Sequence, residues 1–475
     1  MATLNKQSVR GEVDRVKTEF EQLCTAGKVS AEVQALMSTL LLVVELILSI
    51  FLEKTTKKTS KNSSIPSSQT DKDETTDTEQ GRHGKGKQEQ PGTVQNTRTV
   101  EIVKVLPVDQ CDHCGENLET LTAQGHERRT LIDIVFEKVV EQTDAEIKQC
   151  PVCKETTKAD FPDSLSGPLQ YGAGLKAYII NLLVCQMVAL GRVQKLVKSM
   201  IGVVIAEATL LRFVLRLHQA LEDWEQQLLK APAIHVDETS LRVDKKNHWI
   251  HVYASGEWTL KCLHRKRGLE AIEAINIIPR YGGVIIHDCW ASYLSYDHCD
   301  HGLCGSHLLR DLTFIIDSNG YPWARNMKRL LQETCISVAA SKAKKLDDKA
   351  YANLQKRYRN ILTRGEKQLP PIPPKPSGKR GKIAKSDAHN LWERLKKHEA
   401  AVLLFAKKSE VAFTNNRAEQ DLRMAKVKQK VSGCFRNSQY AHAYCRISSY
   451  LQTMANKGYN PLLAIQMALA GEWGE

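Results

Sequence analysis

Two apolar runs that each end in an aspartate decide the fold of this chain: AIHVD at residues 233–237 and GVIIHD at residues 283–288. Two further runs between them, over residues 248–254 and 258–264, are rich in strand-forming residues, and a Ser-Gly-Glu turn joins them. Residues 268–278 then follow a helical pattern. The region therefore begins with three antiparallel strands, a helix and a returning parallel strand.

This order of elements predicts the start of a ribonuclease-H-like α/β fold, in which the first and fourth strands are neighbours. We expect Asp237 and Asp288, at the carboxyl ends of those strands, to lie close together. Two clustered carboxylates repel each other, and a divalent cation between them relieves the repulsion. The alternative interpretation of each aspartate, taken alone, is a turn residue or a helix cap.

A third acidic residue is expected from a later helix, in the stretch TNNRAEQDLRMAK at residues 414–426. Thr414 or Asn415 can cap this helix, and Glu419 lies about one turn inside it. Arg423 and Lys426 follow Glu419 at helical spacing, so all three side chains share one face. A carboxylate for a metal beside cations for DNA phosphates suits DNA strand transfer. The alternative is a surface helix with ion pairs between successive turns.

Four motifs make the resemblance to a known family specific: HVDET from His235, HDCWASY from His287, NNRAE from Asn415 and KQKVSGCFR from Lys428. They resemble those of the insertion sequence 66 family of DDE transposases. The resemblance extends over most of the chain, including its N-terminal heptad helix and cysteine knuckles. The chain departs from the family pattern at Gln420, where arginine is frequent, and at Ala412, where proline is common.

The resemblance implies that Asp237, Asp288 and Glu419 form the catalytic triad and hold Mg²⁺ or Mn²⁺. It also implies metal-dependent cleavage and strand transfer at the ends of an insertion sequence. The expected partners are DNA, as terminal inverted repeats and target, further copies of the chain and accessory transposition proteins. Two alternatives stay open. One is a nuclease or resolvase on the same fold, and the other is an inactive DNA-binding relic or regulator.

The composition agrees with a nucleic-acid partner. The 475 residues are enough for several domains, and 67 Lys and Arg against 54 Asp and Glu give a pI near 9.0. Thirteen cysteines follow a polar N-terminal stretch without the apolar core of a signal peptide. We therefore expect reduced thiols or metal ligands rather than disulfides, and a cytoplasmic location.

Two Cys-x-x-Cys knuckles, Cys111/Cys114 and Cys150/Cys153, predict one structural zinc site. Four thiolates fill a tetrahedral zinc ion and leave no position open for catalysis. An apolar run between the knuckles, Thr130–Val140, is expected to form a small ribbon.

Residues 172–229 are predicted to be helical. Arg192–Ile201 forms one amphipathic helix, Gly202 supplies a turn, and Ala206–His218 forms the next helix. This outline is typical of a helix-turn-helix that reads DNA, although an ordinary helical hairpin has the same pattern. The basic residues that favour DNA are Arg192, Lys195, Lys198, Arg212 and Arg216.

The N-terminal region contains a heptad seam of apolar residues: Val29, Val33, Leu36, Leu40, Val43, Ile47 and Ile50. Such a seam predicts a coiled coil that joins two or more chains, and the alternative is a helix buried within its own chain. Residues 40–52 are the only membrane candidate. We expect no span, because the stretch is short and Glu45 interrupts it.

These observations predict a multidomain α/β protein: a ribonuclease-H-like mixed sheet with a helical insertion, preceded by a coiled-coil helix, a zinc module and a helix-turn-helix. The expected boundaries are 1–53 for the coiled-coil segment, 54–100 for a disordered linker, 101–160 for the zinc module, 161–230 for the helix-turn-helix region, 231–440 for the catalytic domain with a basic helical insertion at about 320–400, and 441–475 for a helical tail. His307 and Arg310, after an apparent short strand, are secondary site candidates.

Overall fold

A computed structural model of the chain describes residues 6–56, 58, 62, 104–129, 131, 137–163, 165, 167–221, 224–372 and 385–472. Its contacts divide the chain into two compact units. The first comprises residues 1–84 and 222–453, and the second comprises residues 85–221 and 454–475. The expected linker, residues 54–100, lies almost entirely outside the described residues.

The first unit is built on a five-stranded sheet with the order β5-β4-β3-β6-β7. Its strands are β3 (Ala233–Val243), β4 (Lys246–Ser255), β5 (Trp258–His264), β6 (Val284–His287) and β7 (Asp300–Leu303). Strands β3, β4 and β5 pair antiparallel, whereas β6 runs parallel to β3 and β7 runs parallel to β6. The predicted neighbours, the first and fourth strands, are thus confirmed. The apparent short strand before Gly305 is β7.

Strand β3 is longer than the sequence suggested. It was expected to end in Asp237, but it continues to Val243 and pairs with β4 over its whole second half. Beyond Asp237 the buried side chains still alternate, at Leu241 and Val243, so the period of a half-buried strand persists through a polar stretch. Asp237 therefore lies inside β3, and the residues before and after it both pair with β4.

Both faces of the central strands are buried. On one face Ile234, Val236 and Ile285 pack with Ile272 of α7 (Leu269–Ile275) and with the 3-10 turn η4 (Ile278–Arg280). On the other face Ala233, Val284 and Ile286 pack with α8 (Gly305–Asn319) and the helices that follow it. A parallel pair covered on both faces explains why the runs at 233–236 and 284–286 are almost continuously apolar.

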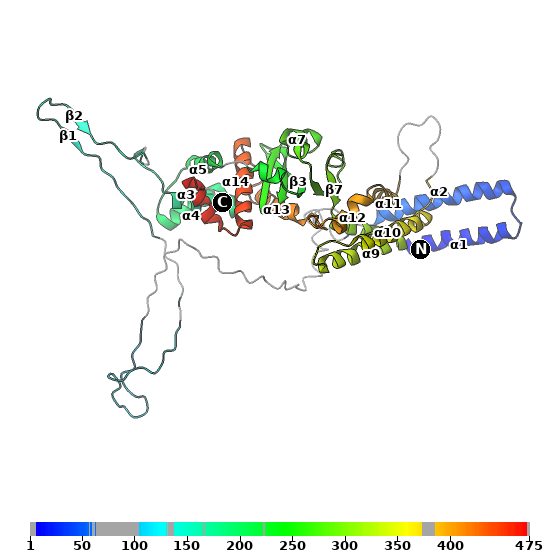
Figure 1. Cartoon of the computed structure of the whole chain (residues 1–475), viewed down its shortest axis with the longest axis horizontal. Helices are drawn as coiled ribbons and strands as arrows, with labels where there is room; N and C mark the ends of the chain where they lie inside the picture. The colour runs from blue at the N-terminus through cyan, green and yellow to red at the C-terminus, as the bar shows by residue number, and fades with distance from the viewer. Residues whose placement is uncertain are drawn as a thin grey trace, which may run out of the picture. The chain divides into compact units, whose positions relative to one another are not determined.

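The helices that follow α8 are α9 (Pro322–Ala340), α10 (Asp348–Gln368), α11 (Asp387–Lys397) and α12 (Glu399–Lys407). They form the expected helical insertion (Figure 1). The buried Tyr358 donates a hydrogen bond to the Leu395 carbonyl over 2.9 Å, which ties α10 to α11. Gly365 lets α10 approach α9 closely, because a Cβ there would meet Trp323 at 2.9 Å.

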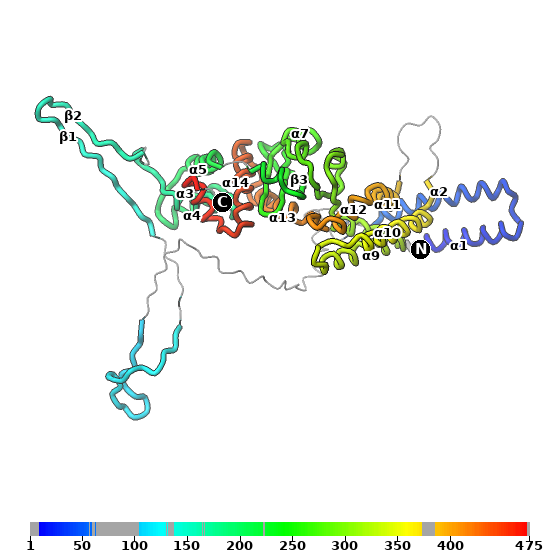
Figure 2. Tube along the Cα trace, viewed as in Figure 1, coloured from blue at the N-terminus to red at the C-terminus, as the bar shows by residue number. Residues whose placement is uncertain are grey.

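The N-terminal helices α1 (Lys6–Thr25) and α2 (Ala31–Thr55) form a hairpin beside this insertion (Figure 2). The buried Glu53 of α2 accepts hydrogen bonds from the main-chain N–H groups of Asp387 and Ala388, at the start of α11. Asn319, at the end of α8, donates its side-chain amide to the same carboxylate. The C-terminal part of α2 is therefore docked within its own chain.

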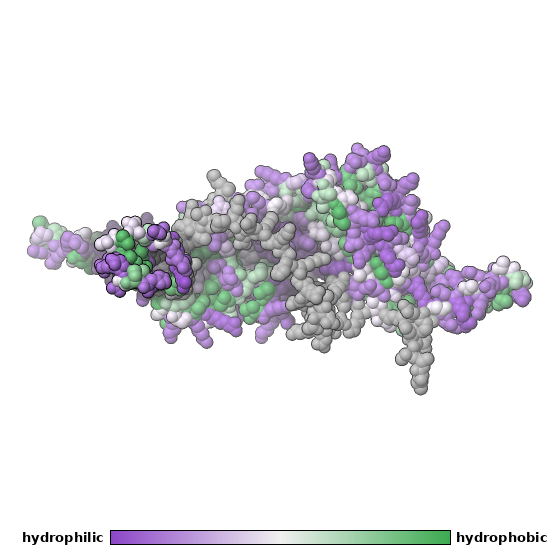
Figure 3. Space-filling view, turned by 90° about the horizontal axis from the view of Figure 1, so that it is seen from below, coloured by the Kyte–Doolittle hydropathy of each residue, from purple (hydrophilic) through white to green (hydrophobic). Residues whose placement is uncertain are grey.

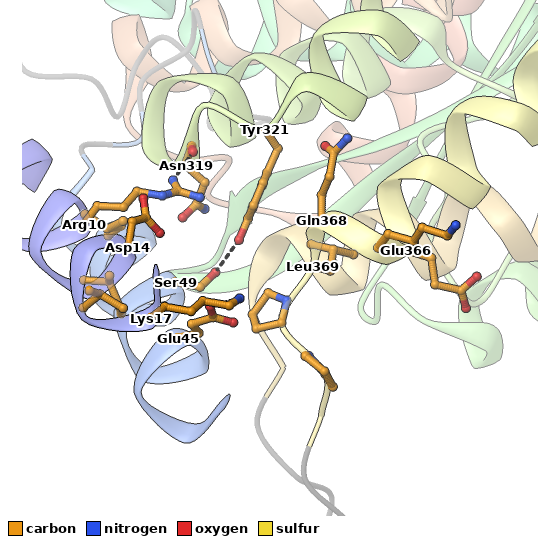
Figure 4. A pocket seen from close by; sticks show the side chains of 16 residues that line it. Arg10, Asp14, Lys17, Glu45, Ser49, Asn319, Tyr321, Glu366, Gln368 and Leu369 are labelled. Carbon is orange, nitrogen blue, oxygen red and sulfur yellow. Dashed lines mark hydrogen bonds and ion pairs between the residues drawn. The ribbon is translucent and has the colours of Figure 1, made fainter. Parts of the chain in front are cut away.

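A polar cavity of about 490 Å³ lies along this docked surface (Figure 4). Tyr321 and Ser49 meet across it with their hydroxyl oxygens 3.4 Å apart, and Lys17 forms an ion pair with Glu45 at 2.8 Å. The cation of Arg10 also contacts the Asn319 carbonyl. These polar contacts hold α1 and α2 against the insertion without a continuous apolar seam.

Most of the predicted heptad seam remains outside the core. Leu36, Leu40 and Ile47 are 71%, 53% and 61% exposed, whereas Leu46 and Leu52 are buried. In the described part of the chain α2 is the one helix long and apolar enough to cross a membrane by length and composition. The helix extends well beyond residues 40–52, so length alone does not exclude a span, and the absence of a span stays a prediction. The surface drawn in Figure 3 is mainly hydrophilic.

Two later helices complete the first unit: α13 (Asn416–Ser432) and the first part of α14 (Ser438–Asn456). A buried polar network joins α14 to the edge strand β5. The Thr259 and Lys261 main-chain N–H groups donate to Thr453 and Ser449 over 3.1 and 2.8 Å. Side-chain hydroxyls thus satisfy the outer edge of the sheet, so no unpaired strand edge faces solvent at these positions.

The second unit contains two knuckle turns and a helical group. The strands β1 (Ile147–Gln149) and β2 (Thr156–Lys158) flank the second knuckle. The run 130–140, expected to form a ribbon, lies partly outside the described residues and shows no strand in the rest. The helices are α3 (Ala173–Ile180), the π-turn η3 (Asn181–Cys185), α4 (Leu190–Ile201), α5 (Glu207–Ala220) and α15 (Pro461–Ala470).

The two predicted helices around Gly202 are confirmed as α4 and α5. Gly202 ends α4 in the left-handed conformation, with φ of 69°, which glycine adopts without strain. The C-terminal helix α15 packs on α3 and α5, so it belongs to the same group. One further short helix, α6 (Glu225–Leu229), leads into the sheet of the first unit.

Candidate active site

The parallel pairing of β3 and β6 brings the two predicted aspartates to corresponding positions. His235 is the partner of Ile286 in the register, and Asp237 and Asp288 each lie two residues beyond this pair. Side chains two residues apart on a strand point to the same face. Asp237 and Asp288 therefore lie side by side at one edge of the paired segment, as expected.

The electrostatic environment of Asp237 is set by burial and by the acidic groups near it. Burial raises the pKa of Asp237 well above its ordinary value, and the charges of Glu238, Asp288 and Glu419 raise it further. One hydrogen bond, from the Glu238 main-chain N–H over 2.8 Å, opposes this effect. The charges of Asp288, at the end of β6, and Glu419, on α13, thus both act on the carboxylate of Asp237 on β3.

Glu238, the next residue on β3, is a buried carboxylate with a different role. It accepts hydrogen bonds from Tyr293 over 2.6 Å and from Arg267 over 2.8 Å. Arg267 in turn lies over the rings of Trp249 and Trp290, at 5.1 and 4.5 Å. These partners occupy both oxygens of Glu238, so it fixes the loop after Asp288 to β3. This role was not predicted, although Glu238 belongs to the HVDET motif and Tyr293 to the HDCWASY motif.

Asn415 sets the position of the helix that carries Glu419. Its side-chain amide donates to the Val236 carbonyl over 2.8 Å, and its carbonyl oxygen accepts from His235 Nδ1 over 3.0 Å. Its main-chain N–H donates to the Cys304 thiol over 3.1 Å. Thr414 or Asn415 was expected to cap α13. Asn415 does occupy the N-cap position, but its side chain binds β3 instead of the helix N–H groups.

His307 and Cys304 complete the surroundings of Glu419. Cys304 is the N-cap residue of α8, and His307 lies one turn into that helix. His307 Nδ1 is 3.7 Å from Glu419 Oε1, and both atoms are buried without a hydrogen-bond partner in the described part of the chain. Potential ligand atoms of Cys304, His307 and Glu419 lie within 4.8 Å of one another. His307 was predicted as a site candidate, and Cys304 was missed.

The turn that presents Asp288 is held by a pair of histidines. His287 is fully buried and accepts a hydrogen bond from the Cys289 main-chain N–H at Nδ1, over 3.1 Å. Its other nitrogen therefore donates to His301 Nδ1, also over 3.1 Å. Burial lowers the pKa of His287 to about 3, so the ring is neutral. This support holds Cys289 at a φ of 71°, where the chain leaves β6 sharply.

The basic residues predicted near Glu419 differ in their surroundings. Arg423 is exposed, whereas Lys426 donates to the Ser240 carbonyl over 2.9 Å and to its hydroxyl over 3.0 Å. Burial lowers the pKa of Lys426. Arg423 is thus the freer of the two for a phosphate, and Lys426 joins α13 to β3. Burial lowers the pKa of His307, and the nearby cation of Arg310, the other secondary candidate, lowers it further.

The four predicted zinc cysteines lie in two similar turns. The Cys111 and Cys150 N–H groups donate to Glu116 and Glu155 carbonyls, and Cys114 and Cys153 are exposed. Within the described residues no group of three or more close ligand atoms includes these cysteines. The single four-thiolate zinc site therefore stays a prediction. The predicted DNA-binding side chains of α4 and α5 are all exposed: Arg192, Lys195, Lys198, Arg212 and Arg216.

The carboxylate site fits a divalent cation. Burial raises the pKa of Asp237 and the charges of Glu238, Asp288 and Glu419 add to this effect, while Glu419 keeps a buried oxygen without a hydrogen-bond donor in the described part of the chain. Carboxylate oxygens are the ligands that Mg²⁺ and Mn²⁺ prefer. The residues able to hold such an ion are Asp237, Asp288 and Glu419, and His307 is the nearest nitrogen ligand.

The five-stranded mixed sheet, with helices on both faces, is that of an α/β domain. The model of one protein family, described as "Transposase IS66 family", matches residues 168–443, more than half of the chain. The chain belongs to this family of transposases, which are DNA-processing enzymes, and the resemblance of its motifs is confirmed. No protein of curated function matches the sequence.

Proposed function

We propose that this transposase cuts DNA at the ends of an insertion sequence and joins the freed ends to target DNA. The observation that carries the proposal is the convergence of Asp237, Asp288 and Glu419, reflected in the raised pKa of Asp237. We further propose that the sheet is a ribonuclease-H-like core and that these residues are its DDE triad. No nucleoside triphosphate is required, since the attacking groups are water and a DNA 3′-hydroxyl.

Mg²⁺ or Mn²⁺ would be held by Asp237, Asp288 and Glu419. When bound, such ions lower the pKa of the attacking hydroxyl and stabilise the leaving oxygen. The protein itself supplies position and charge. Asn415 keeps Glu419 in register with β3, and the Glu238–Tyr293 contact keeps the Asp288 turn in place. Placing the reacting groups in line accounts for a large part of such catalysis.

DNA would contact the chain in two regions. The exposed Arg423 beside the triad is suited to a phosphate near the cut, with Lys426 contributing positive charge behind it. In the second unit we propose that α4 and α5 form a helix-turn-helix, with Arg192, Lys195 and Arg212 at the DNA. Terminal inverted repeats and target DNA are the proposed partners, together with accessory transposition proteins and further copies of the chain in the cytoplasm.

The test replaces each proposed ligand by its neutral isostere: Asp237→Asn, Asp288→Asn and Glu419→Gln. Cleavage and joining of a duplex that carries the element's own end should fall by several orders of magnitude. DNA binding should persist, because phosphate contacts elsewhere supply it. Asp297→Asn, at an exposed aspartate of the same domain, is the matched control and should cleave normally. A triad variant that cleaves near the wild-type rate overturns the assignment.

The alternatives separate in the same assay. A nuclease or resolvase would release the cut ends and form no joined product with target DNA, although it would need the same triad. An inactive relic or regulator would bind the duplex and cut nothing, with either metal. The neighbouring carboxylates favour an active enzyme, because partly buried acids that repel one another are unfavourable without a cation.

A further inference from the structure

A second group of functional side chains lies at the tip of the β3–β4 hairpin, away from the carboxylates. A cavity of about 350 Å³ there is lined by Lys246, His248, Arg265 and Arg436, which we name the basic pocket. Asp244 is the one acidic residue that lines it. Lys246, Arg265 and Arg436 are exposed, and no ion pair in the described part of the chain involves them.

The basic pocket is held together by main-chain pairing. Asp244 and Lys245 form the tight turn of the hairpin, with φ of 47° and 59°. The Asp244 N–H donates to the Phe435 carbonyl over 2.7 Å, and the Phe435 N–H donates to the Arg242 carbonyl over 2.9 Å. The segment after α13 thus lies against the hairpin tip, and this places Arg436 beside Lys246.

The start of α14 adds to the positive potential of the pocket. Asn437 and Ser438 line it, and Asn437 accepts a hydrogen bond from the Gln439 N–H over 2.7 Å at the first turn. A helix N-terminus carries partial positive charge and favours an anion. Cations from two strand ends and the α13–α14 loop therefore converge with the start of a helix on one cavity. An anionic group with several acceptor oxygens fits this surface.

A row of cations connects the basic pocket to the carboxylate site. Arg423, Lys426 and Lys430 follow Glu419 on one face of α13, which runs alongside β3. Along β3 the six steps from Asp237 to Val243 span about 20 Å. A DNA strand winds round the duplex, so its successive phosphates are about twice as far apart as the rise of about 3.4 Å along the axis, and about three nucleotides of the strand cover this distance.

We propose that the basic pocket binds a backbone phosphate of the DNA strand about three nucleotides from the phosphate that is cut. The inference rests on the proposed function, because the number of nucleotides is counted from the cleaved phosphate. The pocket reads no base. The pocket anchors the DNA strand, and the row of cations on α13 then guides the strand past Glu419.

The test uses duplexes that end in the element's terminal sequence, each with one uncharged methylphosphonate at a different position. Binding is measured without divalent metal, so that cleavage plays no part, and the cut position is mapped separately with wild-type protein and Mg²⁺. Wild type should bind several-fold more weakly when the neutral linkage lies about two to four nucleotides from the cut. Neutral linkages beyond that window, apart from those near the cut itself, should have little effect.

The variant Arg265→Ala/Arg436→Ala should lose this position dependence, and its binding should depend less steeply on salt, by about two in the logarithmic slope. Arg265→Lys/Arg436→Lys keeps the charge and should retain part of the effect. Lys349→Ala/Lys356→Ala, two exposed cations on α10, is the matched control and should keep the wild-type pattern. A protein that cuts DNA but shows no such window, or a double alanine variant that keeps it, overturns the inference. A protein that never cuts overturns the proposed function instead.

Discussion

The side-chain amide of Asn415 donates a hydrogen bond over 2.8 Å to the main-chain carbonyl of Val236, the residue directly before Asp237. This contact links two parts of the chain that are 179 residues apart in sequence. Asn415 is itself almost fully buried. It therefore couples the placement of Glu419 on α13 to the placement of Asp237 on β3.

Asn415→Ala should impair catalysis more than folding. The change leaves the Val236 carbonyl buried without its donor, at a cost of about 1–3 kcal/mol in the free energy of unfolding. Denaturant unfolding measures this cost. Cleavage should fall at least about tenfold and require more Mg²⁺ for half-maximal rate, since a displaced ligand weakens metal binding.

The neighbouring Asn416→Ala is the control, because Asn416 is exposed. It should leave both the rate and the Mg²⁺ requirement unchanged. A merely structural role for Asn415 would lower stability without moving the Mg²⁺ requirement, and that result would contradict the positioning role.

Glu53→Ala should loosen the N-terminal hairpin in a pH-dependent manner. Burial raises the pKa of Glu53 despite hydrogen bonds from the Ala388 and Asp387 N–H groups. A carboxyl whose pKa is raised on folding stabilises the fold most at low pH, and this contribution declines as the pH rises through the raised pKa. Wild type should therefore exceed the variant by about 1–3 kcal/mol near about pH 4, and by less at about pH 7.

Unfolding by denaturant at several pH values measures this difference. Glu32→Ala, an exposed glutamate on the same helix, is the control and should show little change. A difference for Glu53 that grows with pH would contradict the role of burial.

Cys111→Ser/Cys114→Ser should abolish zinc binding. If the two knuckles share one ion, purified wild-type protein holds one zinc per chain through dialysis, and the variant holds none. Metal analysis by mass spectrometry gives the ratio. Cys24→Ser, outside both knuckles, should retain the metal. Zinc content that survives the double change would rule out a shared four-thiolate site.

Charged residues in the exposed part of α2 should separate the chains. Leu36→Glu/Leu40→Glu alters side chains that are 71% and 53% exposed, so the fold of a single chain should be kept. The mass measured by light scattering should fall from an oligomer towards 53.4 kDa. Leu52→Glu is an instructive contrast, because it places a charge in a buried position and should lower stability. An unchanged mass for the double variant would mean that α2 does not join chains.

Local patterns predicted the parts of the site that depend on local structure. The strand around Asp237, the strand before Asp288 and the helix around Glu419 follow from apolar runs and spacing, and their adjacency follows from a parallel pairing. The full length of β3 was not predicted because Glu238, Thr239 and Ser240 are all polar. They interrupt the alternation of apolar and polar residues that marks a strand. Pairing with β4, which the sequence does not display, decides that the strand continues.

The contacts that hold the site could not be predicted, because each joins distant segments. Glu238 meets Arg267 and Tyr293 only after the sheet and its loops have formed. Cys304 belongs to no recognisable motif, and only its proximity to Glu419 in the folded chain makes it part of the site. Likewise, a glutamate at the end of an apolar helix gives no sign of being buried, and Glu53 becomes so because α11 presents two free N–H groups to it.

The docking of α2 has a geometric consequence for any assembly of this transposase. Glu53 and Asn319 fasten α2 to the end of α8, and the opposite end of α8 carries His307 beside Glu419. A helix of 15 residues is a stiff rod about 22 Å long. Two chains paired along their exposed α2 faces would therefore hold their two carboxylate sites at a fixed distance from each other. The same pairing would hold two DNA ends together at a fixed distance from each other.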